Sequence, residues 1–490
     1  MEQLLSKIWN SRFGKYLLPL SFCIGQLINF MFYYLGLAFQ ENIARQTGFV
    51  IGNVLFTVAA FLALLSALRF GGMRLKTLLP LTAVLLFFAG GYLVALLRVG
   101  FTGLWIHNAG QFVFFSFPAF CASVYAVRKR QEQTFFDILE RLGLLAVPAA
   151  LIYLNGALFN CNPFNWGRDL GILNYMTFSY TLMPFLLAML FQFLEAKPFT
   201  LFGRVMTHPQ RIRLAIISLY WLAIIAAGTR GTYFCVVGFC ICLTCSAFLR
   251  RDSRRRSSIL SAAMTFVLCF NIFVYAPAGF GTSRMTVFLQ GLSKGEILTT
   301  TEDPAVSEKL DDLVKADGNE QITNREEPEP SPEPEPSPEP ESSPEPSPDN
   351  IEEENLQIKS RGTLFKLAIK EFQASPLTGM GPMKYSVKYG QYPHNILLEL
   401  LCETGILGSF FLMSLILWAV VRLLRRGWKE RETRYFLLFM IAYAIEANIS
   451  GSLWYCPPLL CALAYSFALP DKENSCESPV KSSTKEPNRP

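Results

Sequence analysis

One histidine of this chain is a candidate for acid–base chemistry. His394 lies in the stretch Tyr392-Pro393-His394-Asn395, at the predicted outer end of a long apolar helix, and is one of three histidines in 490 residues. Because an unperturbed imidazole has a pKa of ~6.5, it can accept a proton at neutral pH, as a general base does. Its position predicts chemistry at the outer membrane surface, on a substrate that arrives in lipid.

Three arginines, Arg230, Arg284 and Arg361, are predicted to lie on the same side of the membrane. A guanidinium group stays charged at a low-dielectric interface and can pair with two phosphate oxygens at once. Arg230 interrupts apolar sequence, where a charge is costly unless it has a partner or a task. The alternatives are a structural ion pair for Arg230 and a solvated charge at a helix start for Arg361. Arg284 is selected on position alone.

The elements that must position these residues are membrane helices. The chain is 51% hydrophobic and 14% aromatic, and its apolar residues come in blocks of roughly 20, long enough to cross a hydrocarbon core. We expect an all-α, polytopic membrane protein with about twelve spans. The predicted spans are 17–39, 49–68, 77–97, 105–127, 135–158, 172–194, 212–228, 232–249, 259–276, 396–421, 434–448 and 453–469.

Lysine and arginine are concentrated in every second predicted loop, which predicts the orientation of the chain. The basic loops follow the second, fourth, sixth, eighth and tenth spans. Both termini are therefore expected in the cytoplasm. Anionic lipid head groups explain this basic rim more simply than nucleic acid does.

One large loop is expected outside the cytoplasm, between helices 9 and 10. The predicted organisation is helices 1–9 in 1–276, the loop in 277–393, helices 10–12 in 394–469 and a disordered cytoplasmic tail in 470–490. Within the loop, the acidic, proline-rich insert 326–348 has nothing to bury and should be an extended spacer. Residues 360–374 have apolar side chains at helical spacing and predict an amphipathic helix at the outer interface.

Several short motifs resemble the O-antigen ligase and O-antigen polymerase superfamily when they are taken in order. They are Ala227-Gly228-Thr229-Arg230-Gly231, Ser360-Arg361-Gly362, Ser375-Pro376-Leu377-Thr378-Gly379-Met380-Gly381, Pro393-His394-Asn395 and Glu403-Thr404-Gly405-Ile406-Leu407-Gly408. The resemblance is sharp over roughly 225–250 and 355–410, and only topological over the first two hundred residues.

The resemblance implies an inverting glycosyltransferase in a bacterial plasma (inner) membrane. Transfer is expected to be independent of a metal, because no Asp-x-Asp motif appears on the predicted outer side and arginines can take the role of a divalent cation. Its donor would be a glycan on undecaprenyl diphosphate and its acceptor a hydroxyl of a glycan or a lipid-linked glycan, with no cofactor. His394 would act as the general base, or would orient the acceptor hydroxyl. Arg230, Arg361 and Arg284 would bind the leaving diphosphate. Whether the acceptor makes the protein a polymerase or a ligase is left open.

Asn395 and Glu403 are supporting residues in this hypothesis. On a continuous helix Glu403 would lie about half a turn around from His394. Either the helix is broken there, or Glu403 braces another part of the site, and a buried pair with an arginine is the simpler interpretation. Two other functional classes compete: a twelve-span transporter or lipid-linked glycan flippase, and a structural protein that recruits partners through its proline-rich arm.

Overall fold

The computed structural model describes residues 1–34, 43–159, 175–201, 204–227, 229–249, 259–264, 361–427 and 429–470, and only the backbone of Arg230. Helices dominate. The N-terminal half contains α1 (Glu2–Asn10), η1 (Phe13–Tyr16), α2 (Leu17–Leu20), α3 (Ile24–Tyr34), α4 (Ile43–Phe70), α5 (Leu75–Val99), α6 (Gly103–Gln111), η2 (Phe112–Ser116), α7 (Phe117–Arg128), η3 (Glu132–Thr134), α8 (Phe135–Gly143), η4 (Leu144–Ala146), α9 (Val147–Phe159) and α10 (Tyr175–Leu194). The remainder contains α11 (Pro209–Ala227), α12 (Arg230–Leu249), α16 (Arg361–Ala374), α17 (Lys384–Tyr389), α18 (Ile396–Gly427), α19 (Arg431–Ser450), η5 (Leu453–Tyr455) and α20 (Pro457–Ala468). One antiparallel pair, β1 (Thr200–Leu201) with β2 (Arg204–Val205), is the sole sheet found among the described residues.

Six helices in the described ranges are long and apolar enough to cross a membrane, or seven if a bent pair counts as one span. The all-helical membrane architecture is therefore found, whereas the expected count of about twelve is not reached. The predicted span 135–158 is divided into α8, η4 and α9. The last predicted span, 453–469, becomes η5 and the short helix α20. The predicted span 259–276 lies mostly outside the described residues.

The first predicted span, 17–39, is broken close to its beginning. The segments Phe13–Leu20 and Ile24–Phe32 meet at 90°. At the break, the ring of Phe22 points into the bundle, where it makes edge contacts with Phe135 at 5.7 Å and Phe439 at 5.3 Å between ring centroids. Such contacts reward burial of an aromatic ring, so packing outweighs helical continuity at this position.

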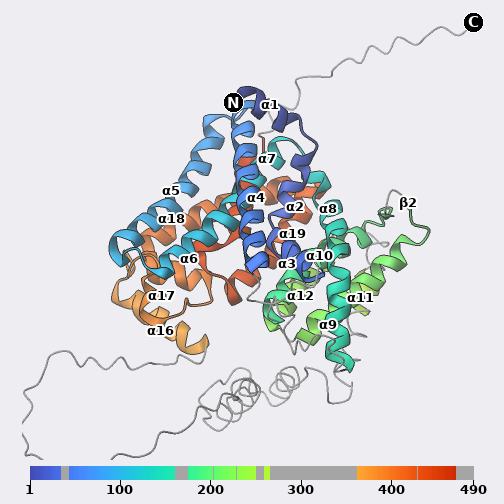
Figure 1. Ribbon diagram of the computed structural model, residues 1–490. Coiled ribbons are helices and arrows are strands. Elements are labelled where there is room, and N and C mark those ends of the chain that lie inside the picture. Colours follow the sequence, from blue (N-terminus) through green and yellow to red (C-terminus); the bar gives the residue numbers. More distant parts are fainter. Residues whose placement is uncertain are drawn as a thin grey trace, which may run out of the picture.

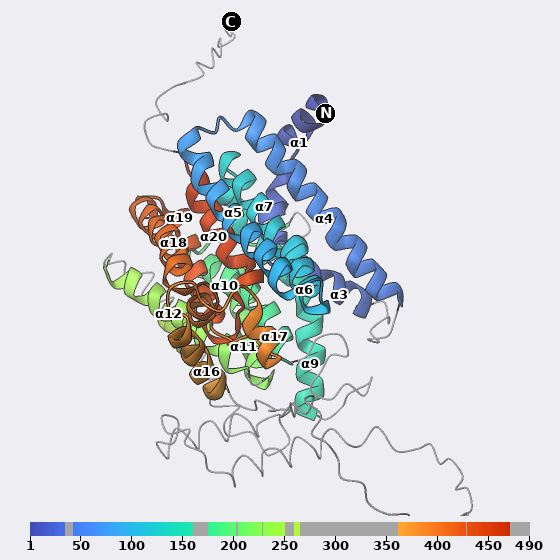
Figure 2. The ribbon, with the colours of Figure 1, turned by 90° about the vertical axis from the view of Figure 1, so that its left-hand side faces the viewer.

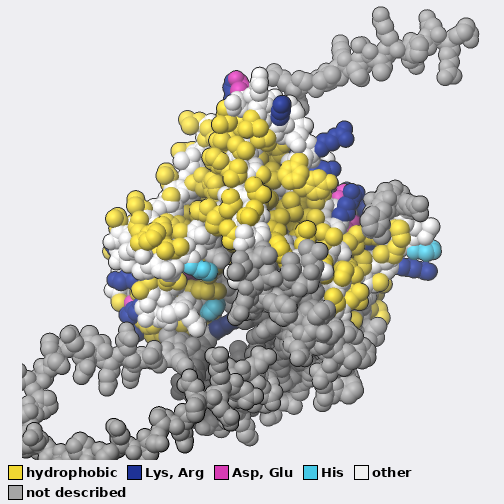
Figure 3. Space-filling view, viewed as in Figure 1, with side chains coloured by type: hydrophobic (Ala, Val, Ile, Leu, Met, Phe, Trp, Pro, Cys, Tyr) yellow, Lys and Arg dark blue, Asp and Glu magenta, His cyan; other side chains and the backbone are white. Residues whose placement is uncertain are grey.

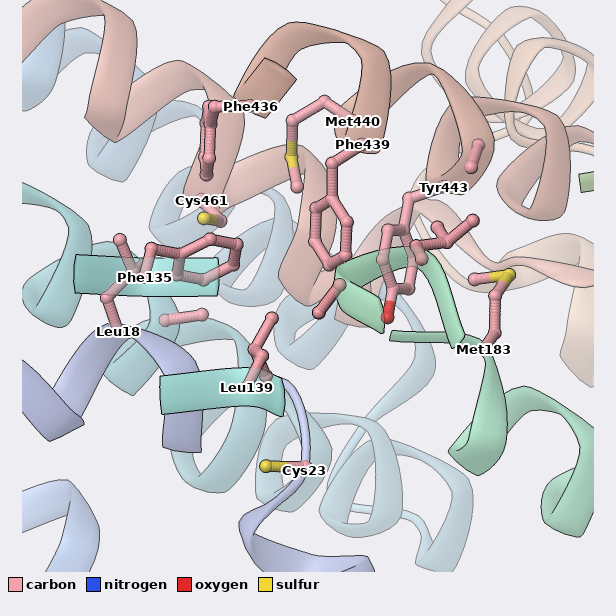
Figure 4. Packing of buried hydrophobic residues seen from close by; sticks show 14 of the residues in the cluster. Leu18, Cys23, Phe135, Leu139, Met183, Phe436, Phe439, Met440, Tyr443 and Cys461 are labelled. Atoms are coloured by element: carbon pink, nitrogen blue, oxygen red, sulfur yellow. The ribbon is translucent and has the colours of Figure 1, made fainter. Parts of the chain in front are cut away.

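Aromatic side chains dominate the centre of the bundle. Figure 4 shows Phe135 and Leu139 of α8 lying close to Phe436 and Phe439 of α19. The ring centroid of Phe135 lies 5.7 Å from that of Phe436 and 5.3 Å from that of Phe439. All four side chains are almost fully buried. The core thus ties α8 to α19 across almost three hundred residues of sequence.

The outer surface of the bundle is strongly apolar. Figure 3 shows hydrophobic side chains over most of the visible middle of the molecule, with Lys and Arg near its margins. Many large exposed side chains come from α5 and α18, among them Leu86 (66% exposed), Leu97 (77%) and Phe410 (75%). A water-facing surface rarely carries so much contiguous apolar area, so these faces fit contact with lipid tails.

The two ends of the bundle differ. Figures 1 and 2 show α1 at one end and α16 with α17 at the other. Basic loop residues gather at the α1 end: Arg69 pairs with Glu2 at 2.8 Å, and the Lys129 ammonium donates to the carbonyl of Trp9. Arg213, close to the predicted basic loop after the sixth span, is fully buried in α11.

The buried Arg213 pairs with a carboxylate of the predicted span 135–158. Its Nε donates to Oε1 of Glu140 at 2.5 Å, and its Nη2 donates to Oε2 at 3.1 Å. The bidentate geometry compensates two charges that would be costly to bury alone. The pair therefore fixes α11 to α8 and does not contribute to the basic rim.

The helix α16 occupies the range expected for an amphipathic helix. Its side chains Leu364 and Ala368 are buried with Tyr385 of α17 and Cys402 of α18, in a small core separate from the main one. Ile369, an apolar residue of the same helix, is 46% exposed. This second core holds α16 and α17 against the beginning of α18, at the end of the bundle opposite α1.

Candidate functional site

Three of the predicted site residues, Arg361, His394 and Asn395, lie around the last turn of α19. Asn448, Ile449 and Ser450 close this helix, and their carbonyl oxygens lack partners within it, as at any helix C-terminus. Three side chains from two other segments, the start of α16 and the stretch before α18, bind these carbonyls. The Asn395 Nδ2 donates to the Asn448 carbonyl at 3.0 Å, an Arg361 Nη1 to the Ile449 carbonyl at 3.0 Å, and the Tyr392 hydroxyl to the Ser450 carbonyl at 3.1 Å.

His394 has an unusual backbone. Its φ is +56°, a left-handed conformation that costs an L-residue about 1–2 kcal/mol. The neighbours fix this conformation: Pro393 is buried before it, and Asn395 caps α18 by accepting a hydrogen bond from the Leu398 amide at 3.0 Å. Strain of this kind is concentrated at functional sites.

The imidazole of His394 is set up to remain neutral. It is partly buried, and its Nδ1 has no hydrogen-bond partner among the described residues. The ring lies against Tyr392, with 4.2 Å between ring centroids. Burial lowers the pKa of His394 below its usual value, and the positive charge of Arg361 lowers it further. A neutral imidazole is able to accept a proton at pH 7.

Arg361 links the histidine to a second group of hydroxyls. In addition to its bond to Ile449, its other terminal nitrogen, Nη2, lies 3.4 Å from the Ser450 hydroxyl. The Ser450 hydroxyl in turn accepts a hydrogen bond from the Tyr180 hydroxyl of α10 at 3.1 Å. The Arg361 guanidinium is exposed at this end of the bundle, so it combines a structural contact with access for a ligand.

The first turn of α12 reaches the same place. A Cβ atom on Gly231 would lie 1.9 Å from the Tyr180 hydroxyl and 3.4 Å from Cγ2 of Ile449. Only glycine permits so close an approach. The backbone of Arg230, the first residue of α12, is thereby brought beside the hydroxyl network of Ser450. The structure thus brings together positions 230, 361, 394 and 395.

Glu403 lies deeper in the bundle than His394, and its partners do not include the expected arginine. Its carboxylate accepts hydrogen bonds from the Met383 amide at 2.7 Å, the Tyr385 amide at 3.3 Å and the Trp454 indole at 2.6 Å. Glu403 is fully buried. The simpler interpretation, a pair with an arginine, is therefore wrong for the described residues, and Glu403 braces the segment that begins α17.

The helix α18 is also broken beside Glu403. A break at this place was one of the two alternatives drawn from the sequence. Gly405 has φ 62° and ψ −166°, which are not helical values. The turn 376–381 fills the break. The amides of Ile406 and Leu407 donate to the carbonyls of Pro376 and Leu377, and the amides of Met380 and Gly381 donate to those of Cys402 and Glu403, at 2.8–3.1 Å.

The two glycine motifs of the sequence thus dock on each other. A Cβ on Gly379 would lie 2.5 Å from the Glu403 carbonyl oxygen, and one on Gly405 would lie 2.5 Å from the Gly379 amide. Both glycines also have positive φ. The spacing of these motifs therefore has a physical cause: one supplies the donors and acceptors that the broken helix leaves open in the other.

A carboxylate that the sequence reasoning missed lies close to this network. Glu446 belongs to α19, one helical turn before Ser450. The signal was available, because Glu446 is an acidic residue within the predicted span 434–448 and such residues mark functional positions in membranes. Arg284, in contrast, lies outside the described residues. No group of three or more His, Cys, Asp or Glu able to hold a metal ion is found in the described ranges.

Comparison with known families gives a match to the O-antigen ligase family over residues 214–413. The matched segment contains the first turn of α12, α16, α17 and the broken part of α18, that is, the elements that surround the last turn of α19. The resemblance read from the motifs is confirmed by this match. No curated protein and no solved structure matches the chain significantly.

Proposed function

On the premise that residues 214–413 form an O-antigen ligase domain, we propose that the protein transfers a glycan from undecaprenyl diphosphate to an acceptor hydroxyl. The family supports a membrane protein of polysaccharide biosynthesis that transfers glycosyl groups. In this proposal the donor is bound at the outer face of the bacterial plasma membrane, and both termini lie in the cytoplasm.

The observation that carries the proposal is the meeting of Arg361, His394 and the start of α12 around the last turn of α19. A diphosphate is a good leaving group only if its negative charge is offset, and a guanidinium offsets it with two hydrogen bonds. Arg361 is exposed at the site, and Arg230 begins a helix whose N-terminus also favours an anion. Arg284 is the third proposed contact.

In the proposed step, the acceptor hydroxyl attacks the anomeric carbon of the donor sugar. The bond between that carbon and the diphosphate oxygen breaks, and its electron pair leaves with the diphosphate, towards the arginines. The hydroxyl proton passes to the neutral ring of His394. A single displacement of this kind inverts the anomeric configuration. The arginines supply the positive charge that a divalent cation supplies in other transferases, so the proposed reaction requires no metal.

Alanine substitution of His394 tests the proposal. Purified protein in liposomes, supplied with lipid-linked glycan, should lose at least ~100-fold in transfer rate, the usual effect of removing a general base. His107 and His208 are both exposed, and replacing either by alanine provides a matched control that should leave the rate unchanged. Full activity of a correctly inserted His394→Ala variant would contradict the proposed site.

Gene deletion separates the two acceptor classes. Single carrier-linked repeat units should accumulate if the protein is a polymerase, and long chains on the carrier should accumulate if it is a ligase. A transporter or flippase would instead leave carrier-linked glycan on the cytoplasmic side of the membrane. The location of the accumulated glycan therefore distinguishes the enzyme from its main alternative.

A further inference from the structure

An apolar cavity lies between α10, α11 and α12, three helices that lie together in the bundle (Figures 1 and 2). Its volume is about 280 Å³, and the helical residues 259–264 complete its wall. The lining includes Leu190 of α10, Trp221 of α11, Ile241 of α12 and Ala262. Ile241 is 57% exposed, so the cavity opens on the apolar surface of the bundle, where lipid tails can enter it.

The lining of this cavity selects a hydrocarbon. Among the described lining residues, Thr244 alone carries a hydroxyl group, which donates to the Cys240 carbonyl of its own helix at 2.8 Å. The other lining side chains are apolar or carry a thiol. A sugar or a phosphate placed here would lose its hydrogen bonds to water without replacement, which is costly. The cavity therefore fits an alkyl or isoprenoid chain.

The cavity lies along the face of α12 that leads inward from the candidate site. The helix α12 begins at Arg230, and positions 230, 237 and 244 share one face because seven residues make almost two helical turns. Val237 and Thr244 line the cavity, about 10 Å and about 21 Å along the axis from the start of the helix. The helix α19 packs on another face of α12, where a Cβ on Gly238 would lie 2.5 Å from Cδ1 of Ile445.

We propose that this cavity holds the isoprenoid chain of the carrier whose diphosphate binds at the start of α12. The inference rests on the proposed function. Half of a hydrocarbon core is about 15 Å thick, so the cavity extends past the middle of the bilayer when it is approached from the candidate site. The acyl chain of a phospholipid in the outer leaflet ends near that middle. A polyprenyl chain is longer and continues beyond it.

The cavity positions the chain rather than adding much affinity. Lipid tails are as apolar as the cavity wall, so a chain that leaves the bilayer for the cavity gains only packing. A chain held along α12 limits the motion of the donor and directs its diphosphate to the site, which raises the rate through orientation. A donor whose chain is too short to reach the cavity lacks this orientation.

Photocrosslinking identifies the occupant directly. p-Benzoylphenylalanine in place of Ile241 reacts with nearby C–H bonds on irradiation, in liposomes of phosphatidylethanolamine and phosphatidylglycerol that contain undecaprenyl diphosphate. Capture of the carrier should saturate with its concentration and exceed capture at position 417 at least tenfold. Leu417 of α18 is the matched control, because it is 64% exposed on the apolar surface and does not line the cavity.

Filling the cavity tests its role in transfer. Ala262→Phe should lower both carrier capture at position 241 and kcat/KM for the undecaprenyl-linked donor at least fivefold. For a donor on a short prenyl chain, kcat/KM should stay within twofold. Ala89→Phe is the matched control, because it adds the same ring at an exposed position of α5. If Ala262→Phe fails to fold, Val237→Phe fills the same cavity from α12.

Equal capture of the carrier at positions 241 and 417 overturns the proposal, as does capture of phospholipid alone at position 241. An equal fall in kcat/KM for the long and the short donor also overturns it. Failure of the two proposals is distinguishable. Wild-type protein that transfers glycan from neither donor refutes the proposed function, whereas normal transfer without preferred capture at position 241 refutes only the role of the cavity.

Discussion

Replacement of Gly405 by alanine should release the turn 376–381 from the break in α18. The φ of 62° and ψ of −166° at Gly405 lie in a region that is essentially reserved for glycine. An added Cβ would lie 2.5 Å from the Gly379 amide nitrogen and 2.5 Å from the carbonyl carbon and oxygen of Leu377. These are backbone atoms and cannot rotate aside, so the turn itself must move.

The cost can be worked out from these contacts. Backbone strain in this region is worth about 1–3 kcal/mol. If the turn moves away, four backbone hydrogen bonds between it and the break are lost, at about 1 kcal/mol each. Because the turn must move, the expected loss of stability is about 4 kcal/mol if residue 405 then relaxes and about 5–7 kcal/mol if it keeps the strained conformation. Because the turn leads into α17 and then His394, transfer activity should fall with it.

The assay is unfolding of the purified protein in detergent, with transfer in liposomes measured in parallel. Gly379→Ala should behave as Gly405→Ala does, because a Cβ there meets the other side of the same contact. Gly110→Ala is the matched control, because a Cβ on Gly110 meets no atom within 4 Å. Wild-type stability in the Gly405→Ala variant would refute the argument that the docked glycines hold the site together.

Three further changes test other parts of the structure. Arg361→Gln should move the acidic limb of the pH–rate profile to higher pH. The Arg361 charge lowers the pKa of His394, and His394 must be neutral to act as the base. An unmoved limb would show that Arg361 does not affect the titration of the base. Glu403→Gln should destabilise the protein by about 2–4 kcal/mol in thermal unfolding, because an amide cannot accept three hydrogen bonds in place of a carboxylate. The control is Glu371→Gln, which removes an ion pair with the exposed Lys388 and should cost about 1 kcal/mol or less. Deletion of 326–348 should leave the transfer rate within twofold, and a larger loss would favour a recruiting role for the proline-rich arm.

The sequence predicted the helical membrane character, and the family match confirms the resemblance carried by the motifs. Hydropathy could not predict where helices break. The contacts of Phe22 that interrupt the first span come from α8 and α19, more than one hundred residues away. The break at Gly405 could be suspected from the angular position of Glu403, but its cause, the docked turn, is a tertiary contact.

Site residues with unusual chemistry were easier to predict than their partners. An arginine and a histidine in apolar sequence attract attention because each is costly or rare there. The carbonyls of Asn448, Ile449 and Ser450, which bring these residues together, belong to the backbone and carry no signal in the residue types. Glu446, an acidic residue inside the predicted span 434–448, did carry a signal in its residue type.

The end of α19 explains why several polar groups must gather where they do. A helix C-terminus carries partial negative charge on its free carbonyls, equivalent to roughly half an elementary charge. Such an end would repel a diphosphate. Arg361, Asn395 and Tyr392 each donate to one of these carbonyls, so the repulsion is offset before any substrate binds. The structural and the proposed functional roles of Arg361 are therefore compatible, because the guanidinium that binds the end of α19 is also exposed. The helices α12 and α18 begin at the same place, and the partial positive charge of their free N–H groups is opposite in sign to that of the α19 carbonyls.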